Sequence, residues 1–318
     1  MVDKNTIKVN DLIFRELIKR GYSLEGNTRI WNIADSKLWY LTPKQAQSYL
    51  DLEADEAYQK EVIQQEIDLI NEYLPEITEE LKDKQVNILD LGCGDGKKAR
   101  MFISGLKGKT KMRYCPVDIS SYMVEKALEN IRKSDVEEVV KFQWNISDFE
   151  NMENVSNLLR YGNFQKTMTL LLGNTLGNFE INELLYEIRS SMKDGDILII
   201  GNGLDNRHPD EILKAYGNKE VDNFLKHIPL QLGLEKEDIT LGVRFKHSRV
   251  ELYYTINKNK TIEFQNKKVV FNEGDQILVS ISYKYTKEDF TAFLKMYFGE
   301  TEIRTSPDNS YALAICKK

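Results

Sequence analysis

A glycine-dense turn interrupts the chain between residues 86 and 99, which read VNILDLGCGDGKKA. The apolar residues before the turn predict a buried strand of a parallel sheet, and a helix is expected directly after it. Gly92, Gly94 and Gly96 carry no Cβ atom, so a ligand can approach their backbone closely. A strand, a glycine turn and a helix in this order are typical of a site for a nucleotide-containing cofactor.

Acidic and aromatic residues follow the ends of the first three predicted strands. Asp90 lies near the end of the first strand, and Asp118 ends the second about 28 positions later, close to the spacing at which an acid binds ribose hydroxyls. After the third strand, at 139–144, Asp148 and Phe149 could hold the amino group and the ring of an adenine. Each acid alone could equally be a helix cap or a loop residue. Three strand ends in this order favour a single cofactor site.

The glycine spacing narrows the class of cofactor. It is GxGxG, whereas dinucleotide-binding folds carry GxGxxG. The spacing resembles motif I of class I methyltransferases that use S-adenosylmethionine (SAM). In those enzymes the turn cradles the amino-acid end of SAM, so the resemblance implies SAM as the cofactor.

A second group of polar residues ends the stretch KTMTLLLGNTLGNF at 166–179. Its apolar part predicts a buried strand, followed by Gly173, Asn174 and Asn178. A strand end beside the first glycine turn would face both the cofactor and the molecule that it modifies. The Asn178 carboxamide offers two donors and one acceptor, enough to hold the carboxylate and the amine of an amino acid. On geometry alone, capping of the next helix is an equal alternative for Asn178.

Composition limits the kinds of partner. The 318 residues are 41% hydrophobic, enough for one large core or about two domains. A net charge of -6 argues against a nucleic-acid partner, because phosphate contacts need a clustered basic surface. The lysine-rich stretch 258–268 is interpreted as the solvated edge of a hairpin.

The cysteines and the hydropathy of the chain indicate its cellular location, and the histidines indicate whether it binds a metal. Cys93, Cys115 and Cys316 show no CxxC spacing, which favours buried, reduced thiols and a cytoplasmic protein. The three histidines are far apart, so no metal is expected. No apolar run approaches the roughly 20 residues of a membrane span, and the first residues lack the apolar core of a signal peptide. We therefore expect no membrane association.

The order of elements predicts the fold that would position these residues. Apolar residues repeat at three and four positions up to about residue 85, which indicates helices. Beyond residue 86 strands and helices alternate, so a parallel sheet with helices on both faces is expected. The strands are expected near 86–91, 112–118, 139–144, 166–172 and 195–201, and the helices near 97–106, 121–133 and 180–192.

Residues 206–285 interrupt this alternation. They predict helices over 209–232 and then antiparallel strands at 241–257, 268–271 and 276–285. A helix at 287–297 and strands near 300–304 and 310–316 would form the reversed final hairpin that distinguishes methyltransferases from dinucleotide folds. The predicted domains are a helical N-terminal part of a substrate domain (1–85), a Rossmann-like methyltransferase domain (86–205 with 286–318) and an inserted α+β substrate or lid domain (206–285).

Longer motifs resemble one methyltransferase family over roughly residues 85–318. These motifs are YCPVDIS (114–120), SDFE (147–150), LLLGNTLGNF (170–179), AYGN (215–218) and FNEGDQILVSISYKY (271–285). They resemble the histidine Nα-methyltransferases of ergothioneine biosynthesis and the fungal dimethylallyltryptophan N-methyltransferases. The resemblance implies an α/β class I SAM-dependent methyltransferase with a seven-stranded Rossmann-like sheet. It also implies an α+β substrate-binding domain made from the N-terminus and an insertion.

The predicted cofactor-binding residues come from four strand ends. They are Asp90, Gly92, Cys93, Gly94, Gly96, Asp118, Ile119, Asp148, Phe149, Gly173 and Asn174.

The same resemblance assigns substrate residues and shows two departures. Asn178 matches an asparagine that holds the substrate amino acid, Tyr216 a tyrosine that contacts its carboxylate, and Ser282 a serine beside the side-chain pocket. Both Asn178 and Tyr216 could orient the amine for catalysis. Leu252 replaces a methionine, and Ser280 replaces a glutamate that pairs with imidazole in histidine-specific members. A serine lacks the charge for that hydrogen bond, worth about 1.5–3 kcal/mol, so an acceptor other than histidine is expected.

The N-terminal part matches the family less well. Tyr49 and Tyr58 are candidates for a substrate-binding tyrosine by their distance from the glycine turn, and Tyr58 is the one we select. The alternative for both is an aromatic residue at a helix surface.

The sequence thus predicts SAM-dependent N-methylation of an amino acid or a similar small-molecule amine, by a monomer or weak dimer. Two alternatives stay open. One is a non-catalytic SAM-binding interaction protein, suggested by Ser280 and Leu252. The other is methylation of a macromolecule, which the acidic composition and the lack of an NPPY-type or DPPY-type loop disfavour.

Overall fold

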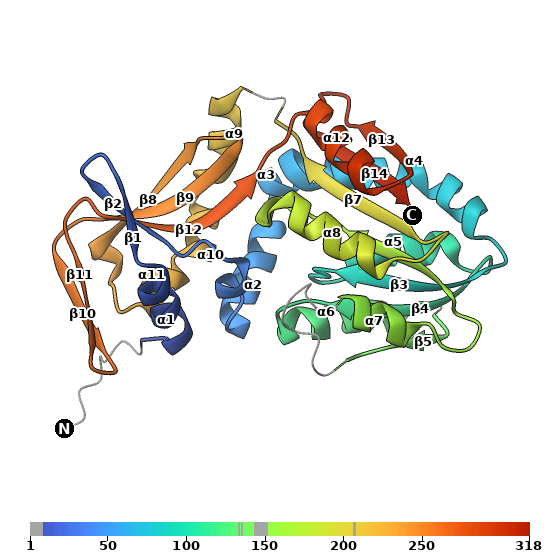
Figure 1. The fold of residues 1–318 in the computed structure, drawn as a ribbon, viewed down its shortest axis with the longest axis horizontal. Coiled ribbons are helices and arrows are strands. Elements are labelled where there is room, and N and C mark those ends of the chain that lie inside the picture. The colour runs from blue at the N-terminus through green and yellow to red at the C-terminus, as the bar shows by residue number, and fades with distance from the viewer. Residues whose placement is uncertain (1–8, 133, 135, 143–151, 206–207) are drawn as a thin grey trace. The chain divides into compact units, whose positions relative to one another are not determined.

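The computed structural model describes residues 9–132, 134, 136–142, 152–205 and 208–318, and the chain forms two compact units (Figure 1). The first unit consists of Met1–Leu52 and His208–Ser282, and the second of Glu53–Arg207 and Tyr283–Lys318. All of residues 1–85 were expected to belong to a substrate domain, whereas the two units divide after Leu52. The function of each unit stays a prediction.

The second unit is built on a seven-stranded sheet with the order β13-β14-β7-β6-β3-β4-β5. The strands from β5 to β7 pair in parallel, and β14 is antiparallel to both β7 and β13. This arrangement confirms the expected parallel sheet with a reversed final hairpin. The strands are β3 (Gln85–Leu91), β4 (Lys111–Val117), β5 (Glu138–Val139), β6 (Lys166–Leu171), β7 (Ile197–Gly203), β13 (Glu300–Thr305) and β14 (Tyr311–Lys317).

Helices cover both faces of this sheet (Figure 1). Successive residues of a strand point to opposite faces, so Ile88 packs in one hydrophobic cluster and Leu89 in the other. Burial on both faces explains why the strands are continuously apolar. One cluster includes α4 (Gln64–Leu81), α5 (Lys97–Leu106) and α6 (Ser121–Ile131), and the other includes α7 (Met152–Leu159), α8 (Ile181–Ser191) and α12 (Lys287–Tyr297).

Three details of the second unit differ from the expectation. Strand β5 ends at Val139, and residues 140–142 are not in a strand, while 143 and 144 lie outside the described residues. Helix α7 was not anticipated. The third detail is a π-helical turn at Gln59–Ile63, which joins the short helix α3 (Glu56–Tyr58) to α4.

The first unit contains a five-stranded sheet with the order β1-β2-β12-β9-β8 and a separate hairpin of β10 and β11. Its strands are β1 (Tyr22–Glu25), β2 (Thr28–Asn32), β8 (Ile239–Phe245), β9 (Arg249–Ile256), β10 (Lys260–Phe264), β11 (Lys267–Phe271) and β12 (Gln276–Tyr283). Its helices are α1 (Asp11–Arg20), α2 (Pro43–Glu53), α9 (Pro209–Tyr216), α10 (Lys219–Leu225) and α11 (His227–Gln231). The hairpin of β10 and β11 falls on the lysine-rich stretch expected to form one.

The expectation that residues 1–85 are helical is wrong for β1 and β2. These strands form a hairpin with a two-residue turn at Gly26 and Asn27. Strand β2 also pairs in parallel with β12, which lies more than 240 residues later in the chain, as the pairing of Ile30 with Gln276 shows. A helical period cannot reveal a pairing between such distant segments. The Gly-Asn dipeptide was the local signal for the hairpin.

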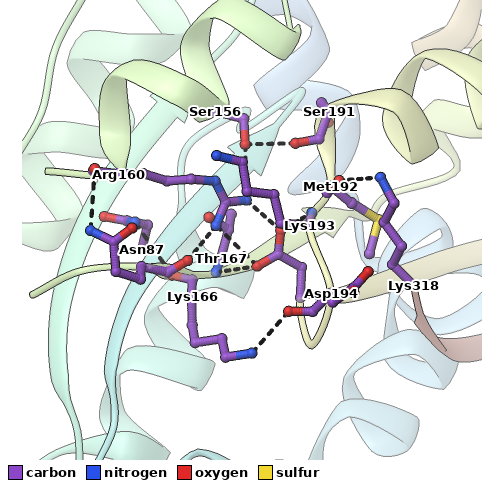
Figure 2. Close-up of polar contacts among 12 residues, drawn as sticks. Asn87, Ser156, Arg160, Lys166, Thr167, Ser191, Met192, Lys193, Asp194 and Lys318 are labelled. Carbon is purple, nitrogen blue, oxygen red and sulfur yellow. Dashed lines mark hydrogen bonds and ion pairs between the residues drawn. The ribbon is translucent and has the colours of Figure 1, made fainter.

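A buried ion pair lies at the amino ends of β6 and β7, two central strands of the seven-stranded sheet. Asp196 forms an ion pair with Arg160, and the two side chains are 1% and 3% exposed. The Asp196 carboxylate also accepts hydrogen bonds from the backbone N–H groups of Thr167, at 2.9 Å, and Lys193, at 2.7 Å. Arg160 also donates to Ser156, which itself donates to the Ser191 carbonyl (Figure 2).

Replacement of Asp196 tests the contribution of this ion pair. Asp196→Asn leaves the Arg160 guanidinium buried without its counter-charge, so the free energy of unfolding in urea should fall by about 3–5 kcal/mol. Glu302→Gln is the matched control, because Glu302 is exposed and pairs with Arg304 at the surface. The control should lose no more than about 1 kcal/mol. Equal losses in the two variants would contradict the structural role given to Asp196.

Candidate active site

The glycine turn between β3 and α5 is held against the end of β4. The Gly92 N–H donates to the Val117 carbonyl at 2.8 Å, and the Gly94 N–H donates to Asp118 Oδ2 at 3.1 Å. Gly92, Gly94 and Gly96 have φ of 64°, 51° and 73°, in the left-handed region that favours glycine.

Gly94 and Gly96 serve different purposes. A Cβ atom at Gly96 would lie 2.9 Å from Ala127 of α6, so this glycine allows α5 and α6 to pack closely. Among the described residues, no atom lies within 4 Å of a Cβ atom placed at Gly94. These residues therefore leave the backbone at Gly94 uncovered beside Asp118, which fits the close approach of a cofactor.

Asp118 directly follows β4, lies against the glycine turn and has capacity for further hydrogen bonds. Its Oδ1 accepts from the Ser120 N–H at 2.9 Å, and its Oδ2 accepts from Gly94. Burial raises the pKa of Asp118 to about 6, against the opposing effect of the hydrogen bonds from Ser120, Gly94 and Ile119. A carboxylate has about four acceptor sites, so some capacity remains beyond these three hydrogen bonds for the hydroxyls of a ribose.

Asp90, near the end of β3, and Cys93, in the glycine turn, are both buried. Asp90 is 4% exposed and accepts a hydrogen bond of 2.7 Å from the Tyr114 hydroxyl. Burial raises its pKa to about 7, the Tyr114 hydrogen bond lowers it, and the charge of Asp118 raises it again. Burial also raises the pKa of the Cys93 thiol well above its ordinary value, so this cysteine stays protonated.

The end of β6 forms a second turn in the same unit. Gly173 and Asn174 have φ of 71° and 62°. The side chain of Asn174 accepts a hydrogen bond of 2.5 Å from the Gly203 N–H, which ties the end of β6 to the end of β7. Asn178 is half-buried and ends the short 3-10 helix Thr175–Asn178.

The capping alternative for Asn178 is wrong. Glu180 is the N-cap of α8, and its side chain accepts from the N–H groups of Asn182 and Glu183. The Asn178 carboxamide is therefore not engaged at the start of that helix.

Two charged residues that the sequence analysis missed lie beside Gly173. Lys98 and Glu66 form an ion pair of 2.8 Å, and Glu66 Oε1 accepts from the Gly173 N–H at 2.8 Å. A Cβ atom at Gly173 would lie 2.8 Å from Lys98 Nζ. Burial is the largest single effect and lowers the pKa of Lys98, but the charges of Glu66 and Glu53 and the hydrogen bond to Glu66 together outweigh it, so the pKa is raised overall. The lysines after the glycine turn were the available signal for Lys98.

The substrate residues inferred for the first unit include one contacting pair. The Tyr216 hydroxyl, at the end of α9, lies 3.4 Å from Ser282 Oγ on β12. Ser280 and Ser282 are both 6% exposed, and Leu252 on the neighbouring strand β9 is 2% exposed.

The two N-terminal tyrosines belong to different units. Tyr58 lies in α3 of the second unit, and its charge is one of the smaller influences on the pKa of Tyr311. Tyr49 belongs to the first unit and packs against Tyr40 and Phe224, with ring centroids 5.5 and 5.3 Å apart. The inferred adenine residues Asp148 and Phe149 lie outside the described residues.

The described part of the chain contains neither a candidate membrane span nor a candidate metal-binding cluster. None of its helices combines the length and the apolar character that a membrane span requires. Within the same residues, no three His, Cys, Asp or Glu side chains are grouped as metal ligands.

Several solved structures are similar to this chain. The PH0226 protein of Pyrococcus horikoshii OT3 is 15% identical with a TM-score of 0.42, over 79% of this chain and 91% of that one. DhpI in complex with SAH is 10% identical with a TM-score of 0.39, over 87% and 98%. Streptomyces venezuelae DesVI is 12% identical with a TM-score of 0.35, over 77% and 90%. At these identities the likeness concerns the fold alone.

No curated protein gives a significant match to the sequence. A protein-family model does match, over residues 53–318, and its description is "Histidine-specific methyltransferase, SAM-dependent". The matched range includes both turns, Asp118, Asn178 and the strand with Ser280 and Ser282. The chain belongs to this family of SAM-dependent methyltransferases.

Proposed function

We propose that the enzyme transfers the methyl group of SAM to the amine of an amino acid or a similar small molecule other than histidine. The observation that carries the proposal is the identity of residue 280. The resemblance places the glutamate of histidine-specific members at this position, which here is Ser280, a residue 6% exposed. A serine can hydrogen-bond a neutral group but cannot supply the charge that imidazole binding uses.

Residues of the second unit would bind SAM. Asp118 would accept hydrogen bonds from the ribose hydroxyls, and the backbone at Gly94 would lie against the cofactor. Lys98 offers a cation for the carboxylate of the methionine part, because its ammonium lies beside Gly173. By their position in the sequence after the third strand, Asp148 and Phe149 would hold the adenine. When bound, SAM supplies an electrophilic methyl group on a positively charged sulfur.

The family resemblance assigns acceptor binding to Asn178 in the second unit and, separately, to Tyr216 and Ser282 in the first. The Asn178 carboxamide, which does not cap α8, can donate to a carboxylate and accept from an amine. The Tyr216 hydroxyl lies near Ser282, so both can be oriented toward one polar group of the acceptor.

Alignment is the main task of these residues. Methyl transfer needs an amine lone pair about 3–3.5 Å from the methyl carbon, in line with the bond that breaks. An ammonium group must therefore lose one proton first. Solvent water would accept that proton, and the amine would then be held by Asn178.

The remaining proposals concern location and assembly. Cys93, Cys115 and Cys316 are all buried and free, which supports the cytoplasmic location predicted from the sequence. The expected monomer or weak dimer stays a prediction.

A screen of amines with isotopically labelled SAM tests the acceptor. Mass spectrometry should find labelled product from an amino acid with an uncharged side chain, and histidine should react more slowly. Ser280→Glu should raise kcat/KM for histidine by about 10- to 100-fold, because it restores a charge-assisted hydrogen bond. Ser23→Glu, on the exposed strand β1, is the control and should change nothing. A wild-type enzyme that prefers histidine would overturn the proposal.

Two alanine variants test whether Asp118 binds the cofactor and Asn178 binds the acceptor. Asp118→Ala should weaken binding of S-adenosylhomocysteine (SAH) by at least about tenfold, because the ribose loses its acceptor. Asn178→Ala should bind SAH like the wild type and lose turnover. Asn163→Ala, at an exposed position, serves as the control. Calorimetry and single-turnover assays give the two readouts, and an equal loss of SAH affinity in both site variants would contradict the assignment of Asn178.

The pKa of Asp118 predicts how SAH binding depends on pH. The ionised carboxylate accepts the ribose hydroxyls, and its pKa is about 6 in the free protein. Protonation competes with binding, so the SAH dissociation constant should rise by about tenfold from pH 7 to pH 5. Asp118→Asn should remove this step, whereas Asp90→Asn should keep it. A constant affinity in the wild type across this range would contradict the role of Asp118.

A further inference from the structure

Glu66 is a buried carboxylate that joins three segments of the second unit. It lies on α4, and its side chain is 1% exposed. Its Oε2 forms the ion pair with Lys98 of α5. Its Oε1 accepts from the Gly173 N–H at 2.8 Å and from the Tyr311 hydroxyl at 2.6 Å. A carboxylate so deeply buried is costly unless each lone pair has a partner, and here both oxygens have partners.

Tyr311 extends these contacts to the next residue of the turn. It is the first residue of β14 and is 2% exposed. Its hydroxyl donates to Glu66 and receives a backbone hydrogen bond from Asn174. Glu66 and Tyr311 therefore bind two consecutive peptide groups, those of Gly173 and Asn174. Both residues of this turn have positive φ, which is unfavourable for an asparagine unless contacts stabilise it.

The backbone of β7 leaves room for this arrangement. A Cβ atom at Gly201 would lie 2.2 Å from Glu66 Oε1 and 2.6 Å from the Tyr311 hydroxyl. No side chain larger than hydrogen fits at that position without displacing one of the two groups. Gly201 has no positive φ, so space for the Glu66 and Tyr311 contact is the reason for a glycine here.

The helix that carries Glu66 begins irregularly. The π-helical turn Gln59–Ile63 directly precedes α4, and the Gln64 N–H bonds the Gln59 carbonyl five residues earlier. Such turns are rare in helices and occur frequently at functional sites. Beyond the turn, Gln65 donates to Asp308 at 2.9 Å, which fastens the start of α4 to the segment before β14.

We propose that Glu66 and Tyr311 are positioning residues for methyl transfer. They hold the turn Gly173–Asn174 in its left-handed conformation, and Glu66 holds the Lys98 ammonium beside that turn. The consequence for SAM rests on the proposed function, because it uses Lys98 as the partner of the cofactor carboxylate. The effect on the turn itself does not depend on any ligand.

Two substitutions remove single contacts with little change in shape. Tyr311→Phe keeps the ring and removes the hydroxyl, so Asn174 loses its acceptor. Glu66→Gln keeps the volume but places an amide donor or an uncharged oxygen against the Lys98 ammonium, so the lysine is no longer held. Glu76→Gln is the matched control on the same helix, because Glu76 is exposed and pairs with Arg304.

Amide hydrogen exchange of the ligand-free protein measures directly how firmly the turn Gly173–Asn174 is held. In Tyr311→Phe and Glu66→Gln, the amides of Gly173 and Asn174 should exchange at least about tenfold faster than in the wild type. The amide of Leu89 in the core of β3 should keep its protection. Glu76→Gln should exchange like the wild type. Unchanged exchange at Gly173 and Asn174 in both variants would overturn the proposal, and so would a uniform loss that includes Leu89.

The SAH affinity of the same proteins measures the effect of these contacts on cofactor binding. Both variants should bind SAH at least about tenfold more weakly, whereas Glu76→Gln should not. Lys98→Met should also weaken binding but leave exchange at Gly173 and Asn174 unchanged. If wild-type protein does not bind SAH, the proposed function fails while the exchange result still decides the positioning role. Wild-type SAH affinity in the Glu66 and Tyr311 variants would overturn that role.

Discussion

The glycine turn after β3 depends on two hydrogen bonds to the end of β4. The Gly92 N–H is fixed to the Val117 carbonyl, and the Gly94 N–H is fixed to the Asp118 carboxylate. These bonds exist because β3 and β4 pair in parallel and in register, with Leu91 opposite Val117. The same pairing brings two strand ends to one edge of the sheet, where ligands of open α/β folds bind. Every proposed contact with the ribose requires this geometry.

The two ends of the parallel strands differ in their effect on stability. At the amino ends of β6 and β7, Asp196 is fully paired, and this arrangement favours stability. At the glycine turn, burial raises the pKa of Asp90 and Asp118 to about 7 and 6. The folded state therefore binds more protons than the unfolded state between about pH 4 and pH 7, and these two groups reduce stability as the pH rises through that range. Such a cost is common where a site is preorganised for a ligand.

Local patterns were sufficient to predict the sheet and the glycine turn. Buried parallel strands are continuously apolar, and the glycines after β3 mark a backbone that side chains cannot adopt, so both features are visible within a few residues. The hairpin of β1 and β2 was missed because β2 pairs with β12, far along the chain. Glu66 and Tyr311 were missed for the same reason, since they are 245 positions apart in the sequence and each looks ordinary on its own element. Contacts set by tertiary structure leave no local signal.

A structure of the protein crystallised with SAH tests the central claim most directly. The account predicts both ribose hydroxyls within hydrogen-bonding distance of the Asp118 carboxylate, and the amino-acid end against Gly94 and the Lys98 ammonium. The account would be contradicted if SAH were bound elsewhere, or if Asp118 and the glycine turn contacted only protein atoms in the complex.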